Sequence, residues 1–364
     1  MDTNTDLNRR GFMKAAGSGF GGAGLLIALG EDTTADQRKP AATKSLRTEK
    51  DKLAQIASNT WPLRSLFKSR AGGRGNPRGD EMKQKYGEIT MLDMPRFTKE
   101  TFPGVTRMDL FSGLFGDVTD DTMYVTGPGG RGREFDPSSA SGRKWLDTLA
   151  NTMAKSGTSC QHISNNAPRD LSELEPERRK AGIEVAKKWL EAGKIIGAKS
   201  MRVNSGGPRI APPAVAQPGD YPKADELAKY IGACIESLKE LADYGGKAGV
   251  RVTLENHWGL TANPMNVRAI LDEVGHPFCE ASPDLCNWEH EYLLYHGLKA
   301  LAPYTHTTVH AKYWNRWKEN DVRRSVKIML DSGFTGAFAL EYEDGPWDGV
   351  EGSKYLYKEV LAAL

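Results

Sequence analysis

Cysteine is scarce in this chain: four occur among 364 residues, and no two form a CxxC pair. Their spacing fits neither a zinc knuckle nor a dense disulfide framework. Cys279 and Cys286 are near enough in sequence to bridge in an oxidising compartment, but we expect buried free thiols. The fold must therefore be held by its apolar core, which a hydrophobic content of 39% makes possible at this length.

An excess of charge is also missing, because 49 Lys and Arg residues face 47 Asp and Glu residues, for a formal net charge of +2. A nucleic-acid-binding protein carries a basic field, so this balance argues against a nucleic-acid partner. The densest glycine-arginine stretch, KSRAGGRGNPRGDE at residues 68–81, predicts a surface loop, with an anion site as the alternative.

Long apolar runs are absent except near the N-terminus, where AAGSGFGGAGLLIALG follows NRRGFMK. The charged region with Arg9 and Arg10 followed by a short apolar region is typical of an export signal of the twin-arginine type. The run is shorter than the roughly 20 residues of a membrane-spanning helix. We therefore expect a signal peptide at 1–30 and a polar linker at 31–50. The twin-arginine translocation machinery should export the protein to the periplasm or beyond, and the mature protein should have no stable membrane span.

The rest of the chain alternates between strand-like and helix-like segments. The expected strands lie within residues 53–61, 105–111, 158–164, 198–207, 250–257, 278–288, 305–314 and 336–345. The expected helices lie at 95–102, 141–157, 176–197, 223–249, 263–275, 291–303, 320–333 and 350–364. Eight such units in roughly 300 residues predict a (β/α)8 TIM barrel, a single α/β domain over 51–364. A doubly wound sheet is the alternative, although no GxGxxG motif follows an early strand.

Four potential metal ligands stand at the ends of the last four expected strands. They are Glu255, Asp284, His310 and Glu341, separated by 29, 26 and 31 residues. One unit of such a barrel takes roughly 30 residues, and functional groups gather where the strands end. The spacing therefore predicts one ligand from each unit, all at the same rim of the barrel.

Side-chain alternation predicts that these ligands point inward. In a strand, residues two apart share a face. Glu255 thus shares a face with His257, and His310 shares one with Lys312, whereas the aliphatic residues between them face the helices. Three buried carboxylates are prohibitively costly without a cation. Hard oxygen donors with one imidazole favour a single Mn²⁺, Mg²⁺ or Co²⁺ ion, with Zn²⁺ as a further possibility.

At these positions the chain resembles the xylose-isomerase-like TIM barrel superfamily, the sugar phosphate isomerase/epimerase group. The resemblance covers about residues 51–364 and rests on RVNSGG, LENHWG, SPDLCNW, VHAKYW and ALEYEDG. It implies that Glu255, Asp284, His310 and Glu341 hold a catalytic divalent ion. In ketose 3-epimerases of this group a histidine lies three residues after the metal-binding aspartate, where this chain has Asn287. The endonuclease IV branch needs several more histidines and acids for three zinc ions, whereas four of the seven histidines of this chain, at 276, 290, 296 and 306, are expected in helices or poorly placed positions, which argues against a three-zinc site.

The resemblance and the ligand set together predict a divalent-metal-dependent sugar isomerase or epimerase that acts through a cis-enediolate. Glu255 and Glu341 are the expected acid–base pair on either side of a small carbohydrate substrate. A metal-dependent lyase or hydratase acting on 3-keto-glycosides is one alternative, and a non-catalytic exported sugar-binding protein is another. An oligomer is possible. The candidate substrate-binding residues are His162, Arg202, Asn204, His257, Asn287 and Lys312.

Overall fold

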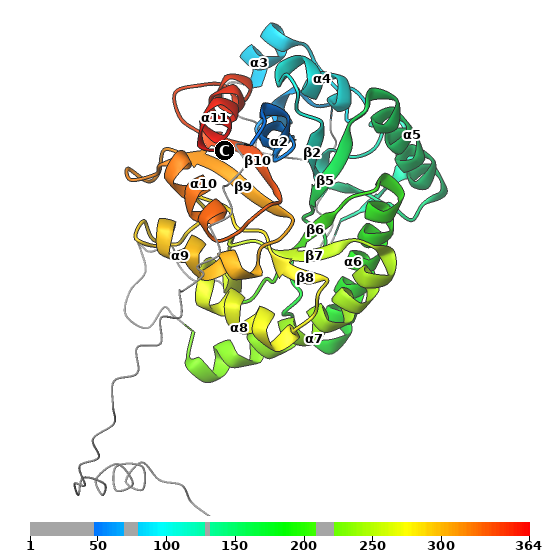
Figure 1. The fold of residues 1–364 in the computed structure, drawn as a ribbon. Coiled ribbons are helices and arrows are strands. Elements are labelled where there is room, and N and C mark those ends of the chain that lie inside the picture. The colour runs from blue at the N-terminus through cyan, green and yellow to red at the C-terminus, as the bar shows by residue number, and fades with distance from the viewer. Residues whose placement is uncertain (1–46, 69–78, 128–131, 209–221) are drawn as a thin grey trace, which may run out of the picture. The chain divides into compact units, whose positions relative to one another are not determined.

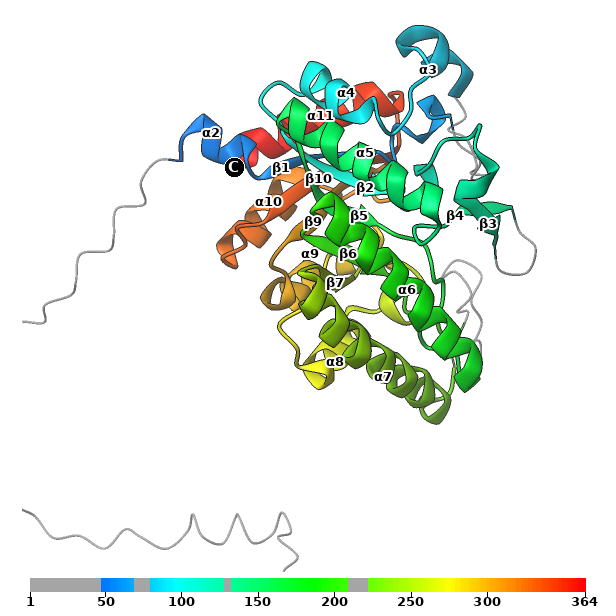
Figure 2. The same ribbon diagram turned by 90° about the vertical axis from the view of Figure 1, so that its right-hand side faces the viewer.

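The computed structural model describes residues 47–68, 79–127, 132–208 and 222–364 (Figure 1). The predicted signal peptide at 1–30 and nearly all of the predicted linker at 31–50 lie outside these ranges. The described part contains an eight-stranded parallel sheet with helices around it, which confirms the predicted TIM barrel (Figures 1 and 2).

Each expected strand range contains one strand of this sheet. The strands are β1 (Ile56–Asn59), β2 (Arg107–Phe111), β5 (Ser159–Ser164), β6 (Ser200–Val203), β7 (Arg251–Leu254), β8 (Cys279–Ala281), β9 (Thr308–Trp314) and β10 (Ala337–Asp344). Their order in the sheet is β8-β7-β6-β5-β2-β1-β10-β9. Neighbours in the sheet are therefore neighbours in sequence, as the barrel topology requires.

The ring closes where the segment after β8 meets β9. Asp284 and His310 form a parallel bridge there. The backbone N–H of His310 donates to the carbonyl of Pro283 at 2.9 Å, and the N–H of Leu285 donates to the carbonyl of His310 at 3.1 Å. The closing contact thus sets two of the predicted metal ligands side by side.

The helices that follow the strands pack outside the barrel (Figures 1 and 2). They are α4 (Met94–Thr101), α5 (Ala140–Ser156), α6 (Pro176–Ile196), α7 (Ala224–Ala248), α8 (Pro264–Val274), α9 (Leu293–Leu301), α10 (Val322–Asp331) and α11 (Gly349–Ala363). Gly197 ends α6 in the left-handed conformation with φ of 68°, which glycine adopts without steric cost.

Several short elements were not predicted. They are the helices α2 (Glu49–Leu53) and α3 (Gly79–Tyr86), an antiparallel hairpin of β3 (Tyr124–Thr126) and β4 (Arg133–Phe135), and the single 3₁₀ turns η1 (Arg64–Leu66), η2 (Ser112–Leu114), η3 (Asp121–Met123), η5 (Gly259–Ala262) and η6 (Ala302–Tyr304). Helix α2 begins before residue 51, where the barrel was expected to start. Helix α3 begins within the stretch that was predicted as a loop, whose residues 69–78 lie outside the described ranges.

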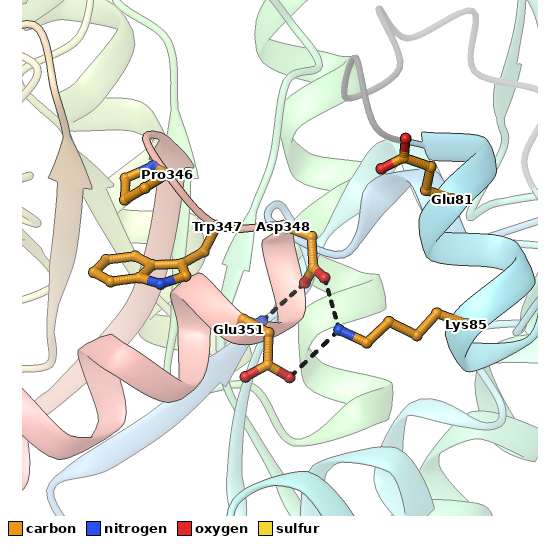
Figure 3. Close-up of a pocket in the computed structure, with 6 residues that line it drawn as sticks. All are labelled: Glu81, Lys85, Pro346, Trp347, Asp348 and Glu351. Carbon is orange, nitrogen blue, oxygen red and sulfur yellow. Dashed lines mark hydrogen bonds and ion pairs between the residues drawn. The ribbon is translucent and has the colours of Figure 1, made fainter.

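Ion pairs connect α3 to the N-terminus of α11, at a concavity of about 330 Å³ (Figure 3). Lys85 lies 3.2 Å from Asp348 and 3.8 Å from Glu351. Beside them Trp347 stacks on Tyr355 with ring centroids 4.6 Å apart. This concavity contains none of the predicted ligands, so its charges serve the packing of α3 rather than the predicted chemistry.

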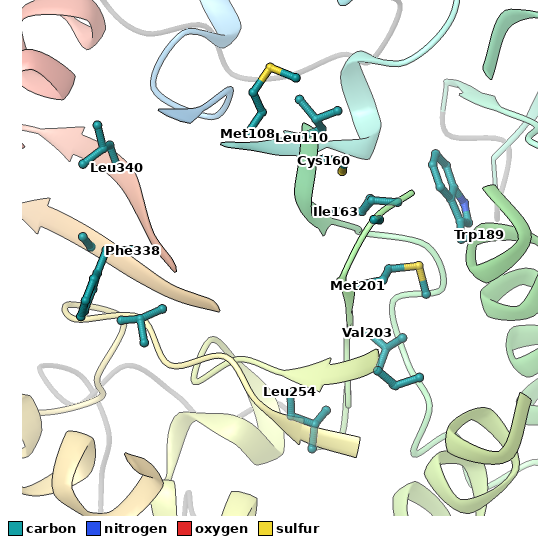
Figure 4. Close-up of a cluster of buried hydrophobic side chains, with 14 of the residues drawn as sticks. Met108, Leu110, Cys160, Ile163, Trp189, Met201, Val203, Leu254, Phe338 and Leu340 are labelled. Carbon is teal, nitrogen blue, oxygen red and sulfur yellow. The ribbon is translucent and has the colours of Figure 1, made fainter. Parts of the chain in front are cut away.

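The main apolar core lies between the outer face of the barrel and the helices. Figure 4 shows Met108, Leu110, Ile163, Met201 and Leu254 among its members. A separate cluster of Ala57, Ala337 and Ala339 lies on the inner side. Alanine leaves space inside the barrel that larger polar side chains fill, so the predicted division into an aliphatic outer face and an ionisable inner face is confirmed.

All four cysteines are free thiols, as expected from their spacing. Burial raises the pKa of each thiol, and that of Cys279 reaches about 12, so they are chemically quiet. Among the described residues, no helix is both long enough and apolar enough to span a membrane.

Candidate metal centre and catalytic cavity

Three of the predicted ligands converge inside the barrel. Glu255 follows β7, Asp284 follows β8 and His310 belongs to β9, and their ligand atoms all lie within 4.8 Å of one another. All three side chains are buried. His310 Nδ1 lies 3.2 Å from Glu255 Oε2. The three side chains therefore surround one small space.

The carboxylate of Asp284 is held rigidly through hydrogen bonds to one of its two oxygens. The backbone N–H groups of Cys286 and Asn287 donate to its Oδ1 at 2.6 and 2.9 Å. The side chain of Asn256 pairs with the backbone of Asp284 in both directions, at 2.7 and 3.0 Å. Asp284 Oδ2 is buried and lies 3.1 Å from the ammonium of Lys312, an ion pair without the alignment of a hydrogen bond. A carboxylate oxygen in this position is suited to a cation.

Glu341 stands outside the converging group, and the ammonium of Lys312 lies between them. Lys312 Nζ is 3.1 Å from Asp284 Oδ2, 2.9 Å from Glu341 Oε1 and 3.4 Å from Glu343 Oε2. Burial alone would lower the pKa of Lys312, but Asp284, Glu341 and Glu343 raise it well above its usual value. Lys312 therefore remains charged and connects two of the four predicted ligands.

The buried carboxyls differ in their affinity for protons. Burial raises the pKa of Asp284 to about 7, against the opposing effect of Lys312. Burial also acts on Glu255, but Arg202 and His310 outweigh it and lower the pKa of Glu255 well below its usual value. The guanidinium of Arg202 lies 2.6 Å from Glu255 Oε2. A divalent ion between them would relieve the cost of ionising Asp284, so these oxygen donors and the imidazole fit such an ion.

Asp109 in β2 is a buried charge at this site that was not predicted. Its Oδ2 lies 3.1 Å from His310 Nε2. It accepts hydrogen bonds from Asn59 at 2.9 Å and from Ser164 at 2.8 Å. A register shift between β2 and β5 places His162 opposite Asp109. A single carboxylate between Met108 and Leu110 in an apolar strand is the sequence signal for it.

A cavity of about 90 Å³ opens beside Glu341 and is partly aromatic. The rings of Trp61 and Phe111 meet edge to face with centroids 5.0 Å apart. The indole N–H of Trp61 donates to Glu343 at 2.7 Å. The cavity is lined by Trp61, Phe111, Ser164, Asn166, Arg202, His257, Lys312, Glu341 and Glu343. Such a combination of aromatic and charged groups suits a small polar ligand with an apolar face.

Three of the six candidate substrate-binding residues, Arg202, His257 and Lys312, line this cavity. Burial lowers the pKa of His257 to about 4, so its imidazole is neutral. Its Nδ1 has no hydrogen-bond partner among the described residues. Arg202 donates to Asn166 at 2.6 Å in addition to its contact with Glu255.

The other three candidates do not line the cavity. Asn287 donates to Glu255 Oε1 at 2.9 Å and accepts from Lys312 at 3.0 Å. Asn204 donates to the carbonyl of Pro168 at 3.1 Å and supports a loop. His162 Nδ1 lies 2.8 Å from Ser200 Oγ, deep in the barrel. The two asparagines therefore support the site rather than face the cavity. His162 forms a second group of potential ligands with Asp109 and His310, whose ligand atoms lie within 4.8 Å of one another, and its Nε2 has no hydrogen-bond partner among the described residues.

Comparison with known proteins shows the family and the fold. A model of the family described as xylose isomerase-like TIM barrel matches residues 125–364. Among solved structures, 3-keto-D-glucoside 4-epimerase from E. coli is 13% identical, with a TM-score of 0.55 over 84% of this chain and 99% of that chain. A xylose isomerase-like TIM barrel protein from Mycobacterium smegmatis in complex with magnesium is 18% identical, with a TM-score of 0.51 over 85% and 97%.

A third solved structure, an L-ribulose 3-epimerase, is 12% identical, with a TM-score of 0.54 over 85% of this chain and 95% of that chain. No curated protein matches the chain significantly. At these identities the structural likeness shows the fold alone.

Proposed function

Because the chain belongs to the xylose isomerase-like TIM barrel family, we propose that it is a divalent-metal-dependent sugar isomerase or epimerase. The observation that carries this proposal is the convergence of Glu255, Asp284 and His310 next to a small cavity. The sugar epimerases among the structures of the same fold support a carbohydrate as the substrate class.

The proposed metal ligands are Glu255, Asp284, His310 and Glu341. Mn²⁺, Mg²⁺ and Co²⁺ suit this set best, and Zn²⁺ is the alternative. When bound, such an ion supplies a Lewis acid that polarises a sugar carbonyl. Glu341 is not part of the group of three converging side chains and is paired with Lys312 at 2.9 Å, so its carboxylate would have to shift toward the other three to join them.

The glutamates have different roles in the proposed proton transfer. Glu341 lines the cavity and can remove a proton from the carbon next to the carbonyl. Glu255 is fixed by Arg202 at 2.6 Å and by Asn287 at 2.9 Å, so its carboxylate can reach a substrate carbon from one side only. Return of the proton from the opposite side gives epimerisation, and return to the neighbouring carbon gives isomerisation. Trp61 and Phe111 can cover the apolar face of a sugar ring.

A metal-dependent lyase or hydratase acting on 3-keto-glycosides is the second candidate function. Lys312 favours it, because its charged ammonium lines the cavity and can give a proton to a departing oxygen. The likeness to a 3-keto-D-glucoside epimerase also supports a keto-glycoside substrate.

Proton NMR in deuterated water tests both functions. We expect the metal-loaded protein, given a panel of free sugars and 3-keto-glycosides, to introduce deuterium at a carbon next to the carbonyl of at least one of them. Release of the aglycone indicates the lyase instead. Protein treated with EDTA is the matched control and should do neither. If the loaded protein changes none of the sugars, the proposed enzymatic function is wrong, and the result favours the non-catalytic sugar-binding alternative.

We also propose that the mature barrel acts outside the cytoplasm, exported as a folded protein through the twin-arginine route with 1–30 as signal and 31–50 as linker. The sequence NRRGFMK supports this. Replacing both Arg9 and Arg10 with lysine should hold the protein in the cytoplasm of its host, as measured by cell fractionation. Arg38→Lys, in the linker, is the matched control and should be exported normally. Equal export of the two variants contradicts the proposal.

A further inference from the structure

We infer that Asp109 is a positioning residue that keeps the ring proton of His310 on Nε2, so that Nδ1 is free to bind the divalent ion. The inference rests on the proposed metal site and concerns a residue outside its ligand set. The two nitrogens of His310 lie at ion-pair distance from two different carboxylates, with Nε2 at 3.1 Å from Asp109 and Nδ1 at 3.2 Å from Glu255, and neither contact has the alignment of a hydrogen bond.

Asp109 is fixed in place by three strands of the barrel. Asn59 at the end of β1 donates to its Oδ2 at 2.9 Å, and Ser164 at the end of β5 donates to its Oδ1 at 2.8 Å. The side chain is completely buried. His162 lies opposite Asp109 in the β2–β5 ladder, and its ring is nearly edge-on to that of His310, with centroids 5.3 Å apart. The carboxylate therefore cannot turn away from His310.

The two carboxylates are not equivalent, and this difference decides where the proton stays. Glu255 is already paired with Arg202 at 2.6 Å and is a proposed ligand, so its charge is compensated. Within the described ranges, Asp109 has no ion-pair partner except His310. Burial lowers the pKa of His310, but Glu255 and Asp109 outweigh it and raise that pKa well above its usual value, so both nitrogens hold a proton. A divalent ion at Nδ1 would displace the proton there, and the proton that remains is most stable on Nε2, beside the uncompensated carboxylate.

Ring tautomer controls metal affinity because only a nitrogen without a proton can donate its lone pair. A carboxylate that holds the other nitrogen fixes the ring and increases its basicity, and loss of such a partner typically costs 10–100-fold in metal affinity. Asparagine at this position would present an N–H to Nε2 and favour the opposite tautomer, with the proton on Nδ1.

The test is Asp109→Asn in the full-length protein, with two measurements besides activity. Titration with Mn²⁺ should show affinity about 10–100-fold weaker than wild type. Nitrogen-15 NMR of histidine-labelled protein loaded with Mg²⁺ should show the signal of a protonated Nε2 for His310 in wild type and its loss in the variant. Ser58→Ala is the matched control, since Ser58 is buried in β1 and bonds outward to Thr98 at 2.8 Å. Its Mn²⁺ affinity should equal that of wild type.

Wild-type Mn²⁺ affinity in Asp109→Asn, or an unchanged His310 signal, overturns the inference. If Asp109→Asn does not fold, Ser164→Ala is the substitute, because it removes one of the hydrogen bonds that orient Asp109. This variant should also bind Mn²⁺ more weakly than wild type, by a smaller factor. Unchanged Mn²⁺ binding in Ser164→Ala then overturns the inference. If the wild-type protein binds no divalent ion, the proposed function is wrong. The role of Asp109 would still be supported in that case if the NMR signal of the proton on His310 Nε2 is present in wild type and lost in Asp109→Asn.

Discussion

Replacing Asp284 or His310 with alanine is expected to remove most of the divalent ion from the purified protein. Both side chains project into the same buried space at the closing seam of the barrel. Loss of a residue that merely supports a ligand costs 10–100-fold in metal affinity, so loss of a ligand should cost on the order of 10²-fold or more. Elemental analysis of the purified variants and titration with Mn²⁺ measure the effect directly.

Asp284→Ala should still fold, because it leaves no buried charge without a partner. His310→Ala should cost stability, because the buried Asp109 loses its ion pair and keeps only the hydrogen bonds from Asn59 and Ser164, so thermal unfolding must accompany the metal measurements. In Asp284→Ala, Lys312 keeps Glu341 at 2.9 Å. In His310→Ala, Glu255 keeps Arg202 at 2.6 Å. Glu280→Gln is the matched control: Glu280 is a buried carboxyl in β8 that accepts a hydrogen bond from the N–H of Thr307 at 2.9 Å, away from the cavity. It should retain the ion, and full occupancy in both alanine variants would show that the ligand assignment is wrong.

The barrel was predictable from the sequence because each strand–helix unit is marked locally. Helices such as α6 have an amphipathic pattern and end at a glycine, and strands such as β6, with the sequence SMRV, alternate polar and aliphatic residues. The two-residue alternation also predicted correctly that Thr253 and His310 turn inward while Val252 and Val309 pack outward. The spacing of one ligand per unit then brought Glu255, Asp284 and His310 together.

Other features depend on contacts that no local pattern records. The shift in register between β2 and β5 brings Asp109 opposite His162 and cannot be read from either strand alone. The position of Lys312 between Asp284 and Glu341 depends on the rotamer of a long side chain. Helix α3 follows a stretch whose glycines indicate a loop, and it is held by ion pairs to a helix more than 260 residues later. Tertiary contacts therefore override the local signal in these places.

Substituting glutamine for Glu255 and Glu341 is expected to separate acid–base catalysis from metal binding. Glutamine keeps an oxygen that coordinates weakly but has no basic carboxylate. If the glutamates transfer protons, each variant should lose roughly 10²–10⁴-fold in rate at saturating metal. Glu255→Gln has a further cost, because it leaves the buried Arg202 without its carboxylate, and breaking a buried pair destabilises a protein by about 3–5 kcal/mol. Thermal unfolding must therefore accompany the rate measurements.

The two rate losses should also depend on the direction of the reaction if the enzyme is an epimerase. One variant should still exchange the substrate proton with solvent deuterium while failing to complete the inversion, because removal and return of the proton use different glutamates. Asp344→Asn is the matched control, since Asp344 ends β10 and is exposed. Recovery of near-normal rates in both glutamine variants with excess Mn²⁺ would mean that the glutamates only hold the ion. The base would then be His257, whose neutral imidazole lines the cavity, because Lys312 remains charged and His162 lies deep in the barrel.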